Sequence, residues 1–425
     1  MQKFSSLFRK EDWWAVWIGL LILLLGVFEA LPVLPAIAKW KVLAGSFPVD
    51  AIGATVWLLV FLTAISLMAI LWIKDTMKIR QFILGFVIVF CLSLIAMWAG
   101  KFVVFTQYGL ETVFWALIIG LLISNLVKIP EWLKQNIHTE FFIKTGLVLL
   151  GAEILFSTIV KGGIIGMGQA LIVVLAVWFF AYWLGRKFGM GPTFASTMAS
   201  GVSICGVSAA IASGGAVKGN PKETSYVISV VLLLAMPMLI AMPFVAKTLG
   251  LTPAVAGAWI GGTIDTTGAV VAAGTLVDPK TGLQVASLVK MAQNVFIGFA
   301  AFFLAIWATM GNKSGDKTSP MEIWYRFPKF ILGFVLASVI FSFVVEPILG
   351  TKETSTVLAV TKGYREWFFV LAFVCIGLET RFKDLVAVGK GKPLAAFCIA
   401  QAFNVVITFG IVWLLWSGIL FEVPV

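Results

Sequence analysis

Long runs of apolar residues dominate the chain, and only short polar stretches separate them. A run of about 20 apolar residues can cross the hydrocarbon core of a membrane as a helix. The pattern predicts about thirteen transmembrane helices, near 13–31, 51–73, 81–106, 109–127, 141–160, 164–185, 192–217, 223–246, 253–277, 282–309, 328–349, 366–380 and 393–418. Because lipid cannot satisfy free backbone groups, such segments must be helical. We expect an all-α polytopic membrane protein.

Composition supports this class of protein. Of 425 residues, 60% are hydrophobic and 12% are charged, about half the charged fraction of a soluble domain. The first apolar run is longer than the core of a typical signal peptide, so we interpret it as a retained span. All four cysteines lie within apolar segments, which argues against a disulfide framework.

The net charge of +11 follows the expected topology rather than indicating nucleic-acid binding. With thirteen spans, the N-terminus and every second loop hold 20 of the 31 Lys and Arg residues, and the opposite side holds ten. The positive-inside rule then places the N-terminus in the cytoplasm and the C-terminus outside. The expected divisions are 1–108 (spans 1 to 3), 109–310 (core spans 4 to 10), 311–327 (cytoplasmic linker) and 328–425 (spans 11 to 13).

Two apolar segments carry the same unusual motif. SGVSICGVSAAIASGG (200–215) aligns without gaps with GGTIDTTGAVVAAG (261–274) at an offset of 60 residues. Small residues in membrane helices often serve close helix packing. Here, however, small and polar residues surround the helix on nearly all sides. A helix break is tolerated at membrane depth only where it lines a cavity or is buried in protein. We therefore favour two broken helices near the midplane, with helix packing alone as the alternative.

Charged residues also fall inside the predicted spans. Asp265 in the second motif aligns with Cys205 in the first. Lys290 lies in the next span, and Asn294 lies on the same helical face as Lys290. An intramembrane charge is a functional candidate by default. Their depths along the helices permit Asp265 and Lys290 to pair, and a purely structural ion pair is the alternative.

A fainter repeat has an offset of 226 residues. LLGAEILFSTIVKGG (149–163) resembles CIGLETRFKDLVAVG (375–389), which pairs Glu153 with Glu379. Inverted repeats are common in secondary transporters, with the binding site near the midplane. The thirteen-span count makes this pair inverted and the 60-residue pair parallel, and the sequence leaves open which pair expresses the symmetry.

These motifs also carry a family resemblance over residues 109–418. SGVSICGVSAAIA, GLVLLGAEI, IGGTIDTTGAVVAAG with Lys290, and CIGLETRFKDL resemble the sulfate exporter family of bacterial membrane proteins, the YeiH-type proteins. The resemblance implies relatedness to cation/proton antiporters and bile-acid-type transporters, an inverted-repeat fold with crossed, broken helices, and a bacterial inner membrane. It would pair span seven with span twelve as the inverted copies, a third pairing that the sequence leaves open. Asp265 stands where such proteins commonly have His, and Gln293 and Asn294 stand near their usual Arg.

The leading hypothesis is a secondary active transporter of a small anion such as sulfate or an organic sulfonate or carboxylate. The resemblance implies that the direction of transport is export. The expected substrate-binding residues are Ser203, Cys205, Gly206, Ser208, Thr263, Thr266, Thr267, Lys290 and Asn294, and the expected ion-coupling residues are Asp265 and Glu153. We expect no cofactor and no metal site beyond a transported or coupling ion, sodium or proton. The expected partners are the lipid bilayer and the anion, not nucleic acid, and a homodimer is left open.

Two other functions remain as alternatives. A cation/proton antiporter would bind its cation at Asp265, with Lys290 as the internal counter-charge. An intramembrane enzyme is disfavoured, because the single histidine, His138, lies in a loop and no HExxH or GxSxG motif is present.

Overall fold

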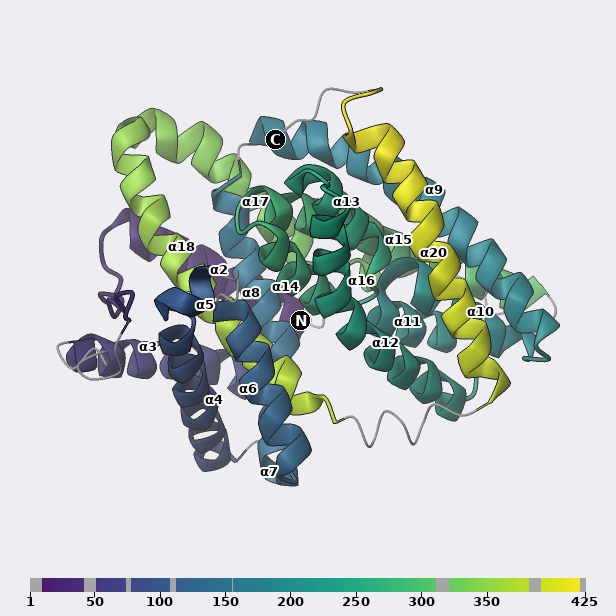
Figure 1. The fold of residues 1–425 in the computed structure, drawn as a ribbon, viewed down its shortest axis with the longest axis horizontal. Helices are drawn as coiled ribbons and strands as arrows, with labels where there is room; N and C mark the ends of the chain where they lie inside the picture. The colour runs from purple at the N-terminus through teal and green to yellow at the C-terminus, as the bar shows by residue number, and fades with distance from the viewer. Residues whose placement is uncertain are drawn as a thin grey trace. The chain divides into compact units, whose positions relative to one another are not determined.

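The computed structural model describes residues 10–41, 51–73, 78–107, 112–154, 156–310, 321–381 and 391–420. Within these ranges the regular structure is helical, apart from one isolated bridge between Trp40 and Phe102 (Figure 1). Eight of the described helical segments are long and apolar enough to cross a membrane. The prediction of an all-α polytopic membrane protein is therefore confirmed.

The chain forms two compact units, each assembled from two stretches of sequence. Unit 1 comprises Met1–Phe156 and Lys329–Arg381, and unit 2 comprises Ser157–Pro328 and Phe382–Val425. A division by sequence position alone does not separate them, because each unit includes segments from both halves of the chain.

Unit 1 is a bundle held by close helix crossings. Gly120 in α6 lies against Gly377 in α18, and Gly151 in α8 lies against the backbone of Phe334 in α17. Small residues permit such backbone approaches in membrane proteins. The described helices of this unit are α2 (Glu11–Val27), α3 (Ile52–Ile73), α4 (Ile79–Ala99), α5 (Val103–Gln107), α6 (Thr112–Leu126), α7 (Glu131–Lys134), α8 (Thr139–Ala152), α17 (Phe330–Ile340), the π-helix η3 (Phe341–Val345) and α18 (Glu346–Glu379).

Unit 2 contains both copies of the 60-residue motif. Its described helices are α9 (Phe156–Lys187, whose first residue belongs to unit 1), α10 (Pro192–Ser200), the π-helix η2 (Gly201–Cys205), α11 (Gly206–Ala216), α12 (Pro221–Thr248), α13 (Pro253–Thr263), α14 (Thr267–Val277), α15 (Thr281–Met310), α16 (Met321–Arg326) and α20 (Lys392–Trp416). Several of these helices have Pro in their first turn and a residue with extended backbone directly before it. Helices α12 and α13 begin in this way.

The first motif forms a re-entrant hairpin, hairpin A (residues 192–216). Cys205 leaves the helical conformation with φ −154° and ψ 88°, and the backbone turns there between η2 and α11. Gly219, just beyond α11, lies against Thr193 at the start of α10. A straight helix would separate these residues by about 39 Å, so both ends of hairpin A lie together.

The second motif forms an equivalent hairpin B (residues 253–277). Its backbone is extended at Ile264 and Thr266, between α13 and α14. Gly257 near the start of α13 and Gly274 near the end of α14 both lie against Gly282 in α15. Each half contains 11 residues, about 16 Å of helix and therefore about half of the ~30 Å hydrocarbon core.

The two hairpins approach the middle of α15 from its opposite ends. Hairpin B packs on Gly282 and Ala286, whereas hairpin A packs on Ile297 and Ala301 further along the same helix. The predicted helix breaks are present, but each segment turns back instead of crossing. The prediction of two parallel spans is therefore wrong, and the two copies of the 60-residue repeat are inverted.

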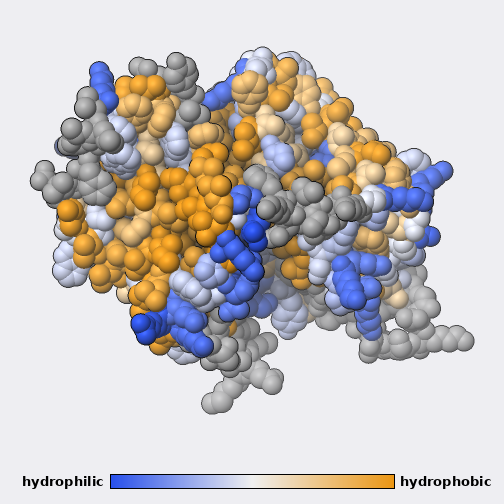
Figure 2. Space-filling model, turned by 60° about the horizontal axis from the view of Figure 1, so that its bottom comes forward, coloured by the Kyte–Doolittle hydropathy of each residue, from blue (hydrophilic) through white to orange (hydrophobic). Residues whose placement is uncertain are grey.

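The surface of the described residues is widely apolar, as a lipid environment requires. Figure 2 shows broad hydrophobic areas, with hydrophilic residues gathered in smaller patches. The exposed apolar side chains include Phe179, Phe244 and Phe303, each more than 60% exposed. Such exposure would be a liability in water and is ordinary for helices in a bilayer.

Candidate functional site

The tips of the two hairpins meet inside unit 2 and form a buried polar site. Tip A is residues 201–206 and tip B is residues 263–267. Cys205 Sγ lies 3.8 Å from Thr267 Oγ1 across the two tips. A break in a membrane helix leaves backbone groups without helical partners, so the side chains around the tips decide how these groups are satisfied.

Lys290 in α15 joins both tips through their backbone carbonyls. Its Nζ donates to Ile204 O at 2.7 Å in tip A and to Ile264 O at 2.8 Å in tip B. A third bond, of 3.0 Å, reaches Gln293 Oε1 one turn along α15. The ammonium of lysine has three donors, and all three are used here.

The expected ion pair between Lys290 and Asp265 is not formed within the described residues. The ammonium donates to carbonyl and amide oxygens instead. Asp265 Oδ2 is buried and has no hydrogen-bond partner among the described residues. The reversal of each hairpin explains this difference. It presents helix C-terminal carbonyls, which carry partial negative charge, to the lysine.

Amide side chains bond further carbonyls at the tips and directly beside them. Gln293 Nε2 donates to Gly262 O at 2.9 Å. From α20, Asn404 Nδ2 donates to Val202 O at 3.1 Å and to Thr263 O at 3.3 Å, and Gln401 Nε2 donates to Thr263 O at 2.9 Å. Asn404 therefore bridges the two tips, as Lys290 does from α15.

Several buried oxygens around the tips have no hydrogen-bond partner among the described residues. They are Ser203 Oγ, Thr263 Oγ1, Asp265 Oδ2, Ser287 Oγ, Asn294 Oδ1 and Gln401 Oε1. Each belongs to a residue that is less than 5% exposed. Buried polar atoms are nearly always paired in proteins, so such a group marks a place where a ligand, an ion or water is expected.

The N-terminal ends of α11 and α14 also face this site. Both helices begin at the tips, at Gly206 and Thr267, and each contains 11 residues. The first turn of a helix carries unpaired amides and partial positive charge, which together favour an anion. Asn294 Nδ2 donates to Thr267 Oγ1 at 3.2 Å, which places that amide beside the start of α14.

Ten of the eleven residues predicted for the site belong to unit 2. Most lie at the tips or on the facing side of α15, whereas Ser208 is exposed on α11. Glu153 belongs to unit 1, where its Oε1 lies 2.8 Å from Arg365 Nε in an ion pair. Glu379, its partner in the 226-residue repeat, accepts a hydrogen bond from Thr139 in the same unit.

Sequence reasoning missed Gln401 and Asn404. They occur in an otherwise apolar span with Thr408, spaced by three and four residues. Side chains at this spacing share one helical face, and Thr408 Oγ1 donates to Asn404 Oδ1 at 2.8 Å. A polar face on this span could have indicated that α20 packs against polar groups. It could not have identified those groups as the carbonyls of the hairpin tips.

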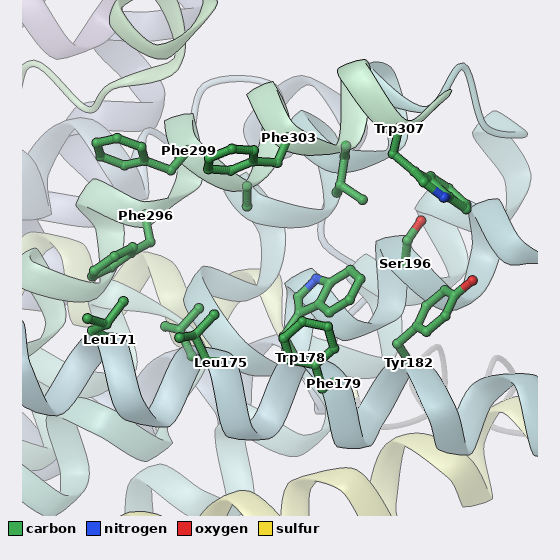
Figure 3. Close-up of a pocket in the computed structure, with 13 residues that line it drawn as sticks. Leu171, Leu175, Trp178, Phe179, Tyr182, Ser196, Phe296, Phe299, Phe303 and Trp307 are labelled. Atoms are coloured by element: carbon green, nitrogen blue, oxygen red, sulfur yellow. The ribbon is translucent and has the colours of Figure 1, made fainter. Parts of the chain in front are cut away.

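A cavity of about 740 Å³ lies elsewhere in unit 2, between α9 and α15. Figure 3 shows aromatic side chains of the two helices facing one another across it. Ser196 and Tyr182 supply hydroxyls, and none of its lining residues is charged. This lining suits hydrocarbon chains and lacks the charged groups that a small ion needs.

The fold and the buried site together define a polytopic membrane protein with two opposed re-entrant hairpins. The model of the family described as Conserved hypothetical protein 698 matches residues 84–396. The chain belongs to this family, whose relatives are UPF0324 membrane proteins.

Relatives in other bacteria share much of the sequence. UPF0324 membrane protein RB9488 of Rhodopirellula baltica is 40% identical over 91% of this chain and 72% of its own length. A UPF0324 membrane protein of Nitratidesulfovibrio vulgaris is 40% identical over 80% of this chain, which spans 60% of that relative. NE0724 of Nitrosomonas europaea is 30% identical over 98% of each chain. No solved structure matches this chain.

Proposed function

We propose that this chain is a secondary active transporter that exports a small anion, such as sulfate or an organic sulfonate or carboxylate. The observation that supports it best is the meeting of the two opposed hairpin tips at Lys290. Transporters commonly place substrate at discontinuous helices near the midplane of inverted repeats. The hairpins supply both features within one unit, and the proposed site lies in a bacterial inner membrane.

The anion would lie at the converging starts of α11 and α14. Their first-turn amides, together with the side chains of Thr267 and Asn294, offer donors and positive dipole ends. The fixed charge of Lys290 would lower the energy of an anion nearby, although its three donors already bond protein oxygens. Lys290 would thus act through its field rather than by direct contact.

Protons or sodium would drive transport, with Asp265 as the coupling residue. Its buried Oδ2 has no partner among the described residues, and an intramembrane carboxylate of this kind is expensive unless it serves a function. The same observation favours the second candidate, a cation/proton antiporter in which Asp265 binds the transported cation.

Thermal melting of the purified protein with an ion panel tests the proposal. Sulfate, sulfite, thiosulfate, taurine-like sulfonates and small carboxylates would be compared at equal ionic strength. An anion at one hundred times its dissociation constant should stabilise the protein by about 2.7 kcal/mol. Thr267→Val, at the start of α14, should abolish the shift. Thr275→Val is the matched control, because its hydroxyl bonds Val271 O within the same helix, and it should retain the shift.

Absence of a shift with every anion would overturn the anion transporter. A shift with sodium, lithium or potassium alone, lost in Asp265→Asn, would establish the antiporter in its place.

A further inference from the structure

The oxygens around the Lys290 ammonium have the arrangement of a cation site. Two are backbone carbonyls from the tips of different hairpins, Ile204 O and Ile264 O, and the third is the amide oxygen Gln293 Oε1. All three lie 2.7 to 3.0 Å from Nζ. Lys290 is 1% exposed, so the ammonium is buried away from bulk solvent.

These ligands are neutral, and this distinguishes the site from a salt bridge. No ion pair joins Lys290 to a carboxylate in the part of the chain that the structure describes. Backbone carbonyls at unwound helix segments are the groups with which transporters hold sodium. A buried charge is costly unless it is bonded, and here backbone dipoles provide the bonding.

We propose that Ile204 O, Ile264 O and Gln293 Oε1 form a monovalent-cation cage, which this chain fills with its own tethered ammonium. The lysine then fastens the two hairpin tips together without an ion from solution. Removal of the ammonium leaves a cage that a small cation, sodium or ammonium, can occupy. The cage is a binding site for a class of ligand different from the transported anion.

One consequence concerns coupling, and it rests on the proposed transport function. If the cage is already filled by Lys290, sodium has no role in joining the tips, and coupling falls to a proton on Asp265. The cage itself can be tested without any substrate, so its failure and the failure of the transport proposal are distinguishable.

The test is thermal melting of Lys290→Ala in chloride salts of ammonium, methylammonium, sodium and N-methylglucamine at equal ionic strength. In N-methylglucamine, which is too large for the cage, the variant should melt lower than the unchanged protein, by about 5 °C or more given the usual sensitivity of melting to stability. Ammonium or sodium should restore at least half of that loss. The unchanged protein and Lys222→Ala, an exposed lysine at the start of α12, should show no such salt dependence.

Equal melting of Lys290→Ala in all four salts would overturn the proposal, as would an equal response of the unchanged protein. If Lys290→Ala does not accumulate, Gln293→Leu provides the test. It keeps the ammonium, and it removes one acceptor of the ammonium together with the bond from Gln293 Nε2 to Gly262 O. It should melt lower than the unchanged protein in every salt alike. Unchanged melting, or recovery by small cations, would contradict a cage filled by the lysine.

Discussion

Gly206 allows the turn of hairpin A to pack against the next helix. A Cβ atom at this position would collide with the side chain of Val231 in α12. The glycine is therefore explained by packing, and a change at Gly206 is not a clean test of ligand binding.

Gly206→Ala should reduce the free energy of unfolding by about 1–3 kcal/mol, the usual cost of overpacking. Val231→Ala would remove the colliding methyl groups, so the double variant should recover part of the loss. Melting of the single and double variants, analysed as a double-mutant cycle, measures the coupling. Strictly additive losses would mean that the collision with Val231 does not cause the effect.

At the scale of helices, α15 and α20 hold the hairpin tips from two sides through polar side chains. Lys290 and Gln293 bond the carbonyls from α15, and Gln401 and Asn404 bond them from α20. The tips are thereby capped by neighbouring helices, as irregular backbone at membrane depth requires. Helix α12, which follows hairpin A as α15 follows hairpin B, carries Val230 at the position equivalent to Lys290. The inverted halves therefore share a shape but not a charge.

Asn404→Leu should destabilise the protein by about 1–3 kcal/mol for each buried carbonyl that it leaves unpaired. It removes the bonds to Val202 O and Thr263 O, although Gln401 still bonds Thr263 O. Thr408→Val is the graded comparison, since it removes a bond to Asn404 but leaves both carbonyls paired. Its loss in melting temperature should be smaller, and equal losses would argue against the bridging role of Asn404.

At the scale of the whole molecule, the hairpins change the expected topology of two loops. If both ends of hairpin A lie on one side, Lys218 and Lys222 join the side predicted to be cytoplasmic, and Lys247 leaves it. The basic residues on that side rise from 20 to 21 of 31, and those on the opposite side fall from ten to nine. The reversal thus agrees slightly better with the positive-inside rule.

Cysteine labelling in intact cells distinguishes the two topologies. The variants are made in a background without the four native cysteines. An impermeant reagent should leave Lys222→Cys unlabelled, as it should leave Ser314→Cys, because we expect both positions to be cytoplasmic. Leu249→Cys, beyond α12, should be labelled. The thirteen-span topology predicts the reverse for Lys222→Cys and Leu249→Cys, so the pattern at these two sites decides between them.

The sequence by itself determined the membrane environment, the helical class and the positions of the breaks. Apolar runs near 20 residues leave helices as the only choice. Gly, Ser and Thr gathered in two matching motifs indicated that a helix can break within 200–215 and 261–274, and the breaks lie at Cys205 and Ile264. Asp265 and Lys290 were found because a charge in such a run is conspicuous.

Only the tertiary structure decided that the broken helices turn back. A segment of 25 residues has the same length and hydropathy whether it crosses or returns, and the choice depends on the packing of Gly257 and Gly274 against Gly282. The partners of Lys290 were hidden for a related reason. A charged side chain such as Asp265 can be identified in the sequence. The two carbonyl oxygens that bind the ammonium belong to the backbone, and they become available only after the chain reverses.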